Sequence, residues 1–392
     1  MSIGGAGSSR RTVLGAMAAV ASLPVTGGAA AAADARFDVH RFGVNYVPSG
    51  HWYYCWNDWS ADAIARDFDA IAGLGADHIR IMLIWPWFQP NPTTVSTAHL
   101  DRLDQMMTLA AARRLDVLVT LYTGWLSGFA FKPHFLEKES FYTAPAWAKA
   151  QDLFLTQTAA RAIRHPNFLG FDVGNEINCC WEATSAQGDP WMRRVLSTMH
   201  RLAPGRVHVN GVDHQPWFGA NSFSPAALIA EQPMVAIHSW PFWTGAAKHG
   251  GPLSKPYTQL PAAMTALVRA HARDADKPVW LQEFGACTEE MTQAQIIPWM
   301  ESAITGAVGQ GVSWFTWWSS HDVDRRFEFN PFEYDLGLLD SDNKVKPRGA
   351  AFRRIADAYR GKRVVRPRTL AAVPTQTGMD ATWRWLLNWM AA

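Results

Sequence analysis

Short, continuous apolar runs alternate along the chain with longer segments that have helical periodicity. Eight of these runs have the length and composition of strands buried on both faces, as in a parallel sheet. They cover residues 41–46, 78–83, 116–122, 168–173, 206–212, 234–238, 278–282 and 311–317. The alternation predicts a parallel sheet with helices packed on its outside.

Capping residues indicate where several helices begin and end. Ser60 precedes a helix expected over 61–74, and Gly75 follows it as a stop signal. Two further starts are predicted where a capping side chain precedes a proline, at Asp189-Pro190 and Ser224-Pro225. The last helix of the series is expected over 349–360.

Eight strand–helix units in about 320 residues favour a (β/α)8 TIM barrel of the α/β class over an open doubly wound sheet. No Gly-x-Gly-x-x-Gly motif follows the first strand, which argues against a dinucleotide-binding fold. We therefore expect one catalytic domain over 36–361. The tail over 362–392 allows either a short helix docked on the barrel or a frayed end.

The first 35 residues have the pattern of an export signal. Arg10 and Arg11 precede an apolar run over 13–25, and an A-x-A cleavage motif ends at Ala35. This pattern predicts a twin-arginine secretion signal over 1–35. The run is shorter than the ~20 residues that a spanning helix needs. We therefore expect a secreted, soluble protein without a membrane partner.

Composition narrows the kinds of partner. Hydrophobic residues make up 48% of the chain and charged residues 18%, as in ordinary globular proteins, and the net charge is only +2. We therefore expect no nucleic-acid partner, and the oligomeric state stays open. The chain is rich in aromatic residues, with 20 Trp and 20 Phe. Exposed rings in a cleft can stack on the apolar faces of sugars.

Chemically reactive side chains lie in or at the ends of the predicted strands, and in such barrels the active site lies at the C-terminal ends. They are Arg80 in the second run, Asn175 and Glu176 after the fourth, His238 in the sixth, Glu283 after the seventh, and Trp317 and Trp318 at the eighth. None of the acidic and histidine residues has metal-ligand spacing, and no Gly-x-Ser-x-Gly motif occurs. We expect no metal and no cofactor.

Two glutamates across one barrel mouth suit retaining glycoside hydrolysis. One carboxyl protonates the leaving oxygen and the other attacks the anomeric carbon, at a separation of ~5–5.5 Å. Repulsion between them raises the pKa of one, which keeps it protonated. We expect Arg80 to keep the nucleophile ionised, and Asn175 to bind the 2-hydroxyl of the sugar. Each residue alone is weak evidence, and the combination carries the prediction.

At these residues the chain resembles clan A glycoside hydrolases, most closely glycoside hydrolase family 5. The resemblance implies that Glu176 is the acid/base and Glu283 the nucleophile. It also implies that the subsite of the cleaved sugar is lined by Arg80, Asn175, His238 and Trp317.

The likeness extends to a subfamily, the eighteenth, of exo-acting β-mannosidases, through blocks such as "HSWPFW" and "WWSSHDV" between Phe42 and Pro347. Two departures from the broader family stand out. The third strand ends near Trp125 where a histidine is usual, and Trp240 replaces a tyrosine. We count Trp125, Trp240 and Trp318 among the expected substrate-binding residues.

The resulting hypothesis is a secreted retaining β-mannosidase that releases terminal mannose from β-1,4-mannosides by double displacement. Its expected partners are manno-oligosaccharides or the mannosyl-β-1,4-N-acetylglucosamine of N-glycans. Aromatic loops over 52–59 and 240–256 are expected to close one end of the cleft, which would make the enzyme exo-acting. An endo-β-1,4-mannanase or β-glucanase, and a non-catalytic carbohydrate-binding barrel, are the alternatives.

Four cysteines, Cys55, Cys179, Cys180 and Cys287, lack any Cys-x-x-Cys spacing. We expect one of the adjacent pair to lie near Cys287 and to bridge to it after export. Free, buried cysteines are the alternative.

Overall fold

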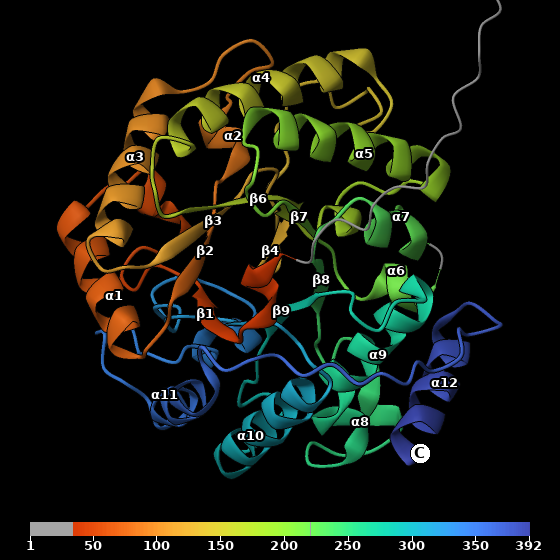
Figure 1. The fold of residues 1–392 in the computed structure, drawn as a ribbon. Coiled ribbons are helices and arrows are strands. Elements are labelled where there is room, and N and C mark those ends of the chain that lie inside the picture. Colours follow the sequence, from red (N-terminus) through yellow and green to blue (C-terminus); the bar gives the residue numbers. More distant parts are fainter. Residues whose placement is uncertain (1–33, 220) are drawn as a thin grey trace, which may run out of the picture. The chain divides into compact units, whose positions relative to one another are not determined.

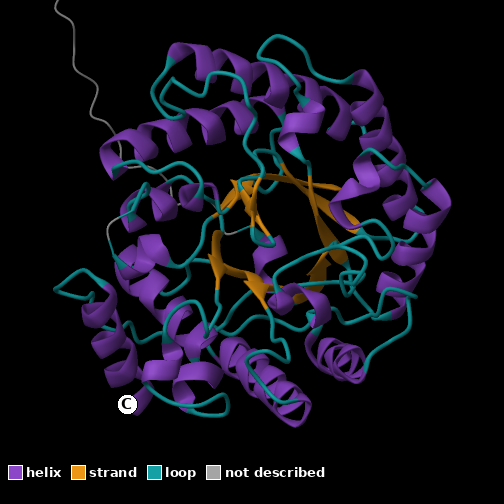
Figure 2. Cartoon of the chain, turned by 180° about the vertical axis from the view of Figure 1, so that it is seen from behind, coloured by secondary structure: helices purple, strands orange, loops and turns teal. Residues whose placement is uncertain are grey.

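Eight parallel strands form a sheet that curls into a nearly closed barrel with helices around it (Figures 1 and 2). The computed structural model describes residues 34–219 and 221–392. Its strands are β1 Arg41–Asn45, β2 His78–Met82, β3 Asp116–Thr120, β6 Phe168–Asn175, β7 Val209–Gly211, β8 Val235–His238, β9 Val279–Phe284 and β10 Trp314–Trp317. The order is β7-β6-β3-β2-β1-β10-β9-β8, and the two edge strands β7 and β8 contact each other. All eight predicted strands and the TIM-barrel fold are confirmed.

A long helix follows each strand except β7, whose helix is short. These helices are α1 Ala61–Gly73, α3 Thr97–Ala111, α4 Pro145–Ala162, α5 Ser185–Leu202, α7 Pro225–Ala230, α9 Leu260–Ala272, α10 Gln293–Gly309 and α11 Pro347–Tyr359. Ser60 caps α1 by accepting a hydrogen bond from the backbone of Ala63, and Ser224 caps α7 in the same way from Ala227. Gly75 has φ +78°, the left-handed conformation expected of a glycine after a helix.

The predicted helix start at Asp189-Pro190 is wrong. Helix α5 begins one turn earlier, after Thr184, because Thr184 and Gln187 form a capping box there. Pro190 lies inside the helix. The Asp189 carboxylate accepts hydrogen bonds from the backbone and hydroxyl of Ser224, which ties α5 to the start of α7.

Short helices, turns and one hairpin lie at the C-terminal ends of the strands. They are the hairpin of β4 Trp125–Leu126 and β5 Phe129–Ala130, the helices α2 Trp85–Phe88, α6 Gln215–Phe218 and α8 Lys255–Thr258, and the 3-10 turns η2 Trp52–Trp56, η3 Ile177–Cys179, η4 Ala246–Lys248 and η5 Pro331–Asp335. A further 3-10 turn, η1 Ala35–Asp38, precedes β1. Loops at this end of such a barrel build the active site.

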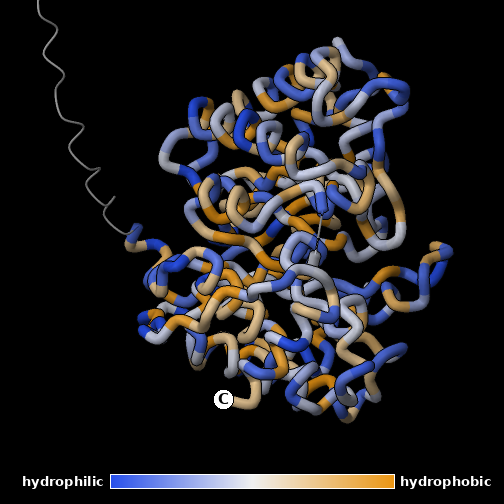
Figure 3. Tube along the Cα trace, turned by 90° about the vertical axis from the view of Figure 1, so that its right-hand side faces the viewer, coloured by the Kyte–Doolittle hydropathy of each residue, from blue (hydrophilic) through white to orange (hydrophobic). Residues whose placement is uncertain are grey.

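The interior of the barrel has its own apolar cluster, separate from the larger core under the helices. It consists of Phe37, Leu118, Leu169, Val207, Val209, Met234, Ala236, Trp280 and Trp314. Successive side chains of a strand point to opposite faces, so on β2 both His78 and Arg80 point into the barrel. Figure 3 shows the hydrophilic segments mainly along the outer turns. The apolar cluster closes one end of the barrel, and the polar interior lies towards the other.

The tail forms helix α12 Met379–Ala391, which packs on α6, α8 and α9 (Figure 1). The indole of Trp383 donates a 2.8 Å hydrogen bond to the carbonyl of Thr244. Lys255 donates one of 2.6 Å to the carbonyl of Met390. Of the two arrangements open from the sequence, the structure has the docked helix.

Residues 1–33 of the predicted export signal lie outside the described residues. Within the part that is described, no helix has the length and apolar character needed to cross a membrane.

Candidate active site

Two glutamates face each other at the C-terminal end of the barrel. Glu176 directly follows β6, and Glu283 lies in β9. One oxygen of each carboxylate and one ring nitrogen of His238 all lie within 4.8 Å of one another. This separation fits a retaining pair at ~5–5.5 Å and is too short for the ~6.5–9.5 Å that leaves room for an inverting water.

Arg80 is fully buried and holds Glu283 from below. Its Nη1 donates a 2.6 Å hydrogen bond to Oε1 of Glu283, and its Nη2 donates one of the same length to Asp172. Burial disfavours the charge on Arg80, but the carboxylates of Asp172 and Glu283 outweigh it and raise the pKa of the guanidinium. A permanent cation at this distance holds the Glu283 carboxylate in place through a charge-assisted hydrogen bond.

His238 bridges the two glutamates. Its Nδ1 lies 2.8 Å from Oε1 of Glu176 and 3.3 Å from Oε2 of Glu283, while its Nε2 lies 3.0 Å from Oε1 of Gln282. Burial lowers the pKa of His238, but the charges of both glutamates outweigh it and raise that pKa. The imidazole therefore fixes the distance between the two carboxylates.

Glu176 occupies an unusual backbone conformation. Its φ of +46° is left-handed, and its N–H donates a 2.8 Å hydrogen bond to the carbonyl of Gly211 in the neighbouring strand. Burial, followed by the charge of Glu283, raises the pKa of Glu176 to about 7, although the hydrogen bond from His238 opposes this. A carboxyl with this pKa holds a proton near neutrality and can act as a general acid.

A cavity of about 470 Å³ opens above the pair. Its walls are formed by Trp125, Ser127, Gly128, Asn175, Glu176, Cys179, Asp213, His214, Gln215, Trp240, Phe242, Trp243, Glu283, Trp318, Asn330, Phe332, Glu333, Leu336 and Met379. The predicted residues Asn175, Trp125, Trp240 and Trp318 are among them. We call this the catalytic cavity.

Asn175 and Trp240 are tied to the catalytic groups. Asn175 Oδ1 accepts a 2.6 Å hydrogen bond from Arg80, and its Nδ2 donates one of 2.5 Å to the carbonyl of Trp125. The indole of Trp240 donates a 3.4 Å hydrogen bond to Oε2 of Glu283. The indole of Trp240 therefore contacts the predicted nucleophile directly.

Three predicted site residues do not line the catalytic cavity. Arg80 and His238 lie beneath it and act on the carboxylates, so they position the glutamates. Trp317 is fully buried, packs edge-on against Phe284 at 5.1 Å and donates to the carbonyl of Leu336. The prediction for Trp317 is corrected: alternation along β10 turns it outwards to the helices, and Trp318 takes the place at the cavity.

The cavity residues that were not predicted individually include Phe242, Trp243, Phe332 and Glu333. The first two lie within the "HSWPFW" block, and the other two lie in η5. Phe332 packs on Phe242 at 5.8 Å and on Trp243 at 5.3 Å. Burial raises the pKa of Glu333 to about 7, and the charges of Glu283 and Glu176 add to this. The site thus holds a third carboxyl group.

Only one of the two loops expected to close the cleft takes part. The 240–256 segment contributes Trp240, Phe242 and Trp243 to the catalytic cavity. In the 52–59 loop, the buried ring of Trp52 packs on Phe329 and the ring of Tyr53 packs on Phe131, with centroid distances of 4.3 and 4.8 Å. This second loop therefore supports the walls from behind.

A second cavity, of about 490 Å³, adjoins the first. Its walls are Trp125, Asn178, Cys179, Glu182, Ala183, Gln215, Asn221 and Ser222. Trp125, Cys179 and Gln215 are shared with the catalytic cavity. We call it the annex.

All four cysteines have free thiols. Cys179 is exposed and lines both cavities, whereas Cys287 is buried near Asp335 and Glu290. The predicted bridge is absent, and the free-cysteine alternative holds, although only Cys55 and Cys287 are buried.

Glu176, His238 and Glu283 also have the spacing of a possible cation site. Their donor atoms already contact one another, and the guanidinium of Arg80 lies against Glu283. A neighbouring positive charge disfavours a second cation, so the arrangement fits acid–base and nucleophilic chemistry better than metal binding.

The fold and the paired carboxylates define a barrel glycosidase. A model of the family "Cellulase (glycosyl hydrolase family 5)" matches residues 37–322. The chain belongs to glycoside hydrolase family 5, whose members are retaining O-glycosyl hydrolases.

Solved structures of subfamily 18 are similar to this chain. One from Streptomyces cattleya, in complex with Manβ1-4GlcNAc, is 36% identical, covers 88% of this chain and 87% of its own, and has a TM-score of 0.82. Another from Bifidobacterium longum subsp. longum, also with Manβ1-4GlcNAc, is 29% identical over 90% and 89% of the two chains, with a TM-score of 0.83.

A curated relative, "Probable glucan 1,3-beta-glucosidase A" of Aspergillus niger, is 25% identical over 241 residues. The match covers 59% of this chain and 54% of the relative, so the chain spans about half the length of that protein.

Proposed function

We propose that the protein is an exo-acting β-mannosidase that releases mannose from β-1,4-mannosides, with Manβ1-4GlcNAc as a preferred substrate. The observation that carries this proposal is the Manβ1-4GlcNAc bound to the Streptomyces cattleya enzyme, which is similar over most of both chains. The blocks shared with subfamily 18 run through the walls of the catalytic cavity.

In the first step, a carboxylate oxygen of Glu283 attacks the anomeric carbon while Glu176 donates its proton to the leaving oxygen. The products of this step are a glycosyl-enzyme and a free leaving group. In the second step, Glu176 takes a proton from water, whose oxygen attacks the same carbon and releases Glu283. Mannose leaves with its β-configuration retained.

The surrounding residues give the two glutamates different environments. Arg80 and Trp240 donate hydrogen bonds to Glu283 and hold its carboxylate in place. Burial keeps Glu176 protonated. His238 contacts both glutamates, so a change of charge on one of them alters the electrostatic environment of the other.

Exo action is supported by the wall that the 240–256 segment and η5 build together. Phe332 of η5 packs on Phe242 and Trp243, and these aromatic residues together form part of the wall of the catalytic cavity. A polymer could pass through an open groove, but such a wall favours a chain end.

The test measures release of free mannose from p-nitrophenyl β-mannoside, Manβ1-4GlcNAc and β-mannan. We expect turnover of the first two substrates, slow attack on the polymer, and β-mannose as the first product in proton NMR. Glu283→Gln should abolish turnover. Rapid formation of mixed oligomers from mannan, or α-mannose as the first product, would contradict the proposal.

A β-glucosidase is the second candidate, because the curated Aspergillus niger relative carries that name. The same assay with p-nitrophenyl β-glucoside separates the two. A kcat/KM for the glucoside above that for the mannoside would favour the second candidate.

We also propose export by the twin-arginine pathway, supported by Arg10, Arg11 and the following apolar run. Replacement of both arginines by lysine should retain the protein inside the cell. Equal secretion of the two forms would exclude this route.

A further inference from the structure

The annex lies on the side of the active site that belongs to the leaving group. Asn178, Cys179 and Glu182 line it, and all three follow Glu176 closely in the chain. Ala183 comes from the same loop, and the remaining wall residues come from the β4 strand or from the segment around α6, so none comes from the neighbourhood of Glu283. The general acid protonates the leaving oxygen, so the part of the substrate that departs must extend towards the loop that follows Glu176.

Trp125 joins the annex to the catalytic cavity. It lines both, and 40% of its surface is exposed. Its carbonyl is held by the 2.5 Å hydrogen bond from Asn175, which fixes this residue next to the catalytic pair. An exposed indole between two cavities can stack on the C–H face of a sugar that passes from one to the other.

The walls of the annex consist mostly of polar side chains, whereas aromatic side chains are prominent in the walls of the catalytic cavity. Asn221 donates a 2.8 Å hydrogen bond to Oε1 of Gln215, and within residues 34–219 and 221–392 the Nε2 of Gln215 has no protein partner. Glu182 is exposed and makes no ion pair in the same part of the chain. Side-chain amides and a carboxylate of this kind suit hydroxyl and amide groups, the chemistry of a second sugar ring.

We propose that the annex is a binding site for a second sugar of the leaving group. The inference rests on the proposed function and extends it: a second sugar beyond the cleaved bond adds binding to that of the disaccharide Manβ1-4GlcNAc. Two sources share this chemistry, the N-acetylglucosamine pair at the base of N-glycans and a manno-oligosaccharide. The exposed Glu182 and the amides of Gln215 and Asn221 then contact that second ring.

The experiment compares kcat/KM for substrates that do or do not reach the annex. Manβ1-4GlcNAcβ1-4GlcNAc is compared with Manβ1-4GlcNAc, and mannotriose with mannobiose. We expect at least one of the longer substrates to be favoured about tenfold, as a few well-placed contacts provide. The pair that shows the gain identifies the source of the second sugar.

Two variants, Glu182→Leu and Asn221→Leu, alter residues that line the annex and not the catalytic cavity. We expect both to lose most of the gain from the second sugar while hydrolysis of p-nitrophenyl β-mannoside stays near the wild-type rate. Glu289→Leu is the matched control, since Glu289 is an exposed acid outside both cavities. Thermal melting checks that all three variants fold.

The inference is overturned if neither longer substrate gains over its shorter partner, or if the gain survives in both annex variants. It fails separately from the proposed function. If the wild type cleaves no β-mannoside, binding of N,N′-diacetylchitobiose and mannobiose to the Glu283→Gln protein is measured by calorimetry. Weaker binding in the annex variants of that protein supports the site, and unchanged or absent binding rejects it.

Discussion

Arg80 donates a 2.6 Å hydrogen bond to Glu283 across the interior of the barrel, and no part of Arg80 reaches solvent. The pair joins β2 to β9, which are separated by β1 and β10 in the sheet. The guanidinium also neutralises Asp172, so one cation serves one proposed catalytic carboxylate and one structural carboxylate.

Replacement of Arg80 by methionine tests this arrangement. It leaves Asp172 and Glu283 buried without their cation, which should cost about 3–5 kcal/mol of stability. It should also lower kcat by roughly 10²-fold or more, because Glu283 loses the charged donor that holds it in position for attack. Arg354→Met is the control, since the ion pair of Arg354 with Glu301 is exposed. Equal kcat values in the two variants would show that Glu283 does not depend on Arg80.

The raised pKa of Glu176 predicts how both the activity and the folding stability of the enzyme depend on pH. Activity should fall as pH rises through about 7, because the general acid loses its proton. Folding stability linked to this group is fully present below the unfolded pKa near 4.5 and is lost as pH rises through about 7.

Glu176→Gln removes that linkage, because the amide stays neutral at every pH. The variant should therefore melt at nearly the same temperature as the wild type at pH 5 and at a higher temperature at pH 8. A pKa raised from 4.5 to about 7 corresponds to a difference in the free energy of unfolding of at most about 3 kcal/mol. Calorimetry at the two pH values measures it, with Glu137→Gln as an exposed control. A melting difference that shrinks as pH rises would contradict the burial argument.

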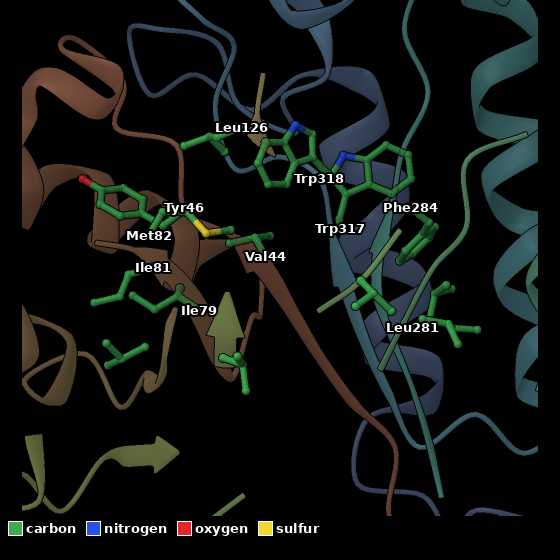
Figure 4. Packing of buried hydrophobic residues seen from close by; sticks show 14 of the residues in the cluster. Val44, Tyr46, Ile79, Ile81, Met82, Leu126, Leu281, Phe284, Trp317 and Trp318 are labelled. Atoms are coloured by element: carbon green, nitrogen blue, oxygen red, sulfur yellow. The ribbon is translucent and has the colours of Figure 1, made fainter. Parts of the chain in front are cut away.

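Two adjacent tryptophans should respond differently to truncation. Figure 4 shows Trp317 beside Phe284 in the apolar cluster and Trp318 on the side of Leu126. Trp317→Ala should cost about 3–5 kcal/mol of stability, because it leaves a cavity in the core. Trp318→Ala should raise KM for the cleaved glycoside with a smaller loss of stability. Melting curves and steady-state kinetics separate the two outcomes, and a larger KM effect at Trp317 would reverse the assignment.

The strand pattern and the two glutamates could be predicted from the sequence because burial on both faces leaves an unmistakable apolar run, and the residues that end such runs share one face. The subsite role of Trp317 was implied by the family resemblance, and the alternation of side chains along β10 contradicts it. Strict alternation places Trp314 and Thr316 inside the barrel, so Phe315 and Trp317 must face the helices. That signal was present in the sequence.

Other features depend on contacts that no local pattern encodes. Glu333 reaches the catalytic cavity from a loop between β10 and α11, where its neighbour Phe332 packs on Phe242 and Trp243. The start of α5 was misplaced because two capping residues, Thr184 and Asp189, lie close together in the chain. Thr184 caps α5, whereas Asp189 binds Ser224 at the start of α7.

Glu333 gives the last prediction, which concerns the pH profile. Burial raises the pKa of Glu333 to about 7, and repulsion from the charges of Glu283 and Glu176 adds to this. Repulsion is reciprocal, so ionised Glu333 raises the pKa of Glu176. Glu333→Gln removes this charge, and the alkaline limb of kcat/KM should move to lower pH by about half a unit. Glu328→Gln, an exposed acid in the same segment, should leave the limb in place. A limb that stays fixed in Glu333→Gln, or that moves to higher pH, would show that Glu333 does not act electrostatically on the acid, and its place in the wall would then be one of shape alone.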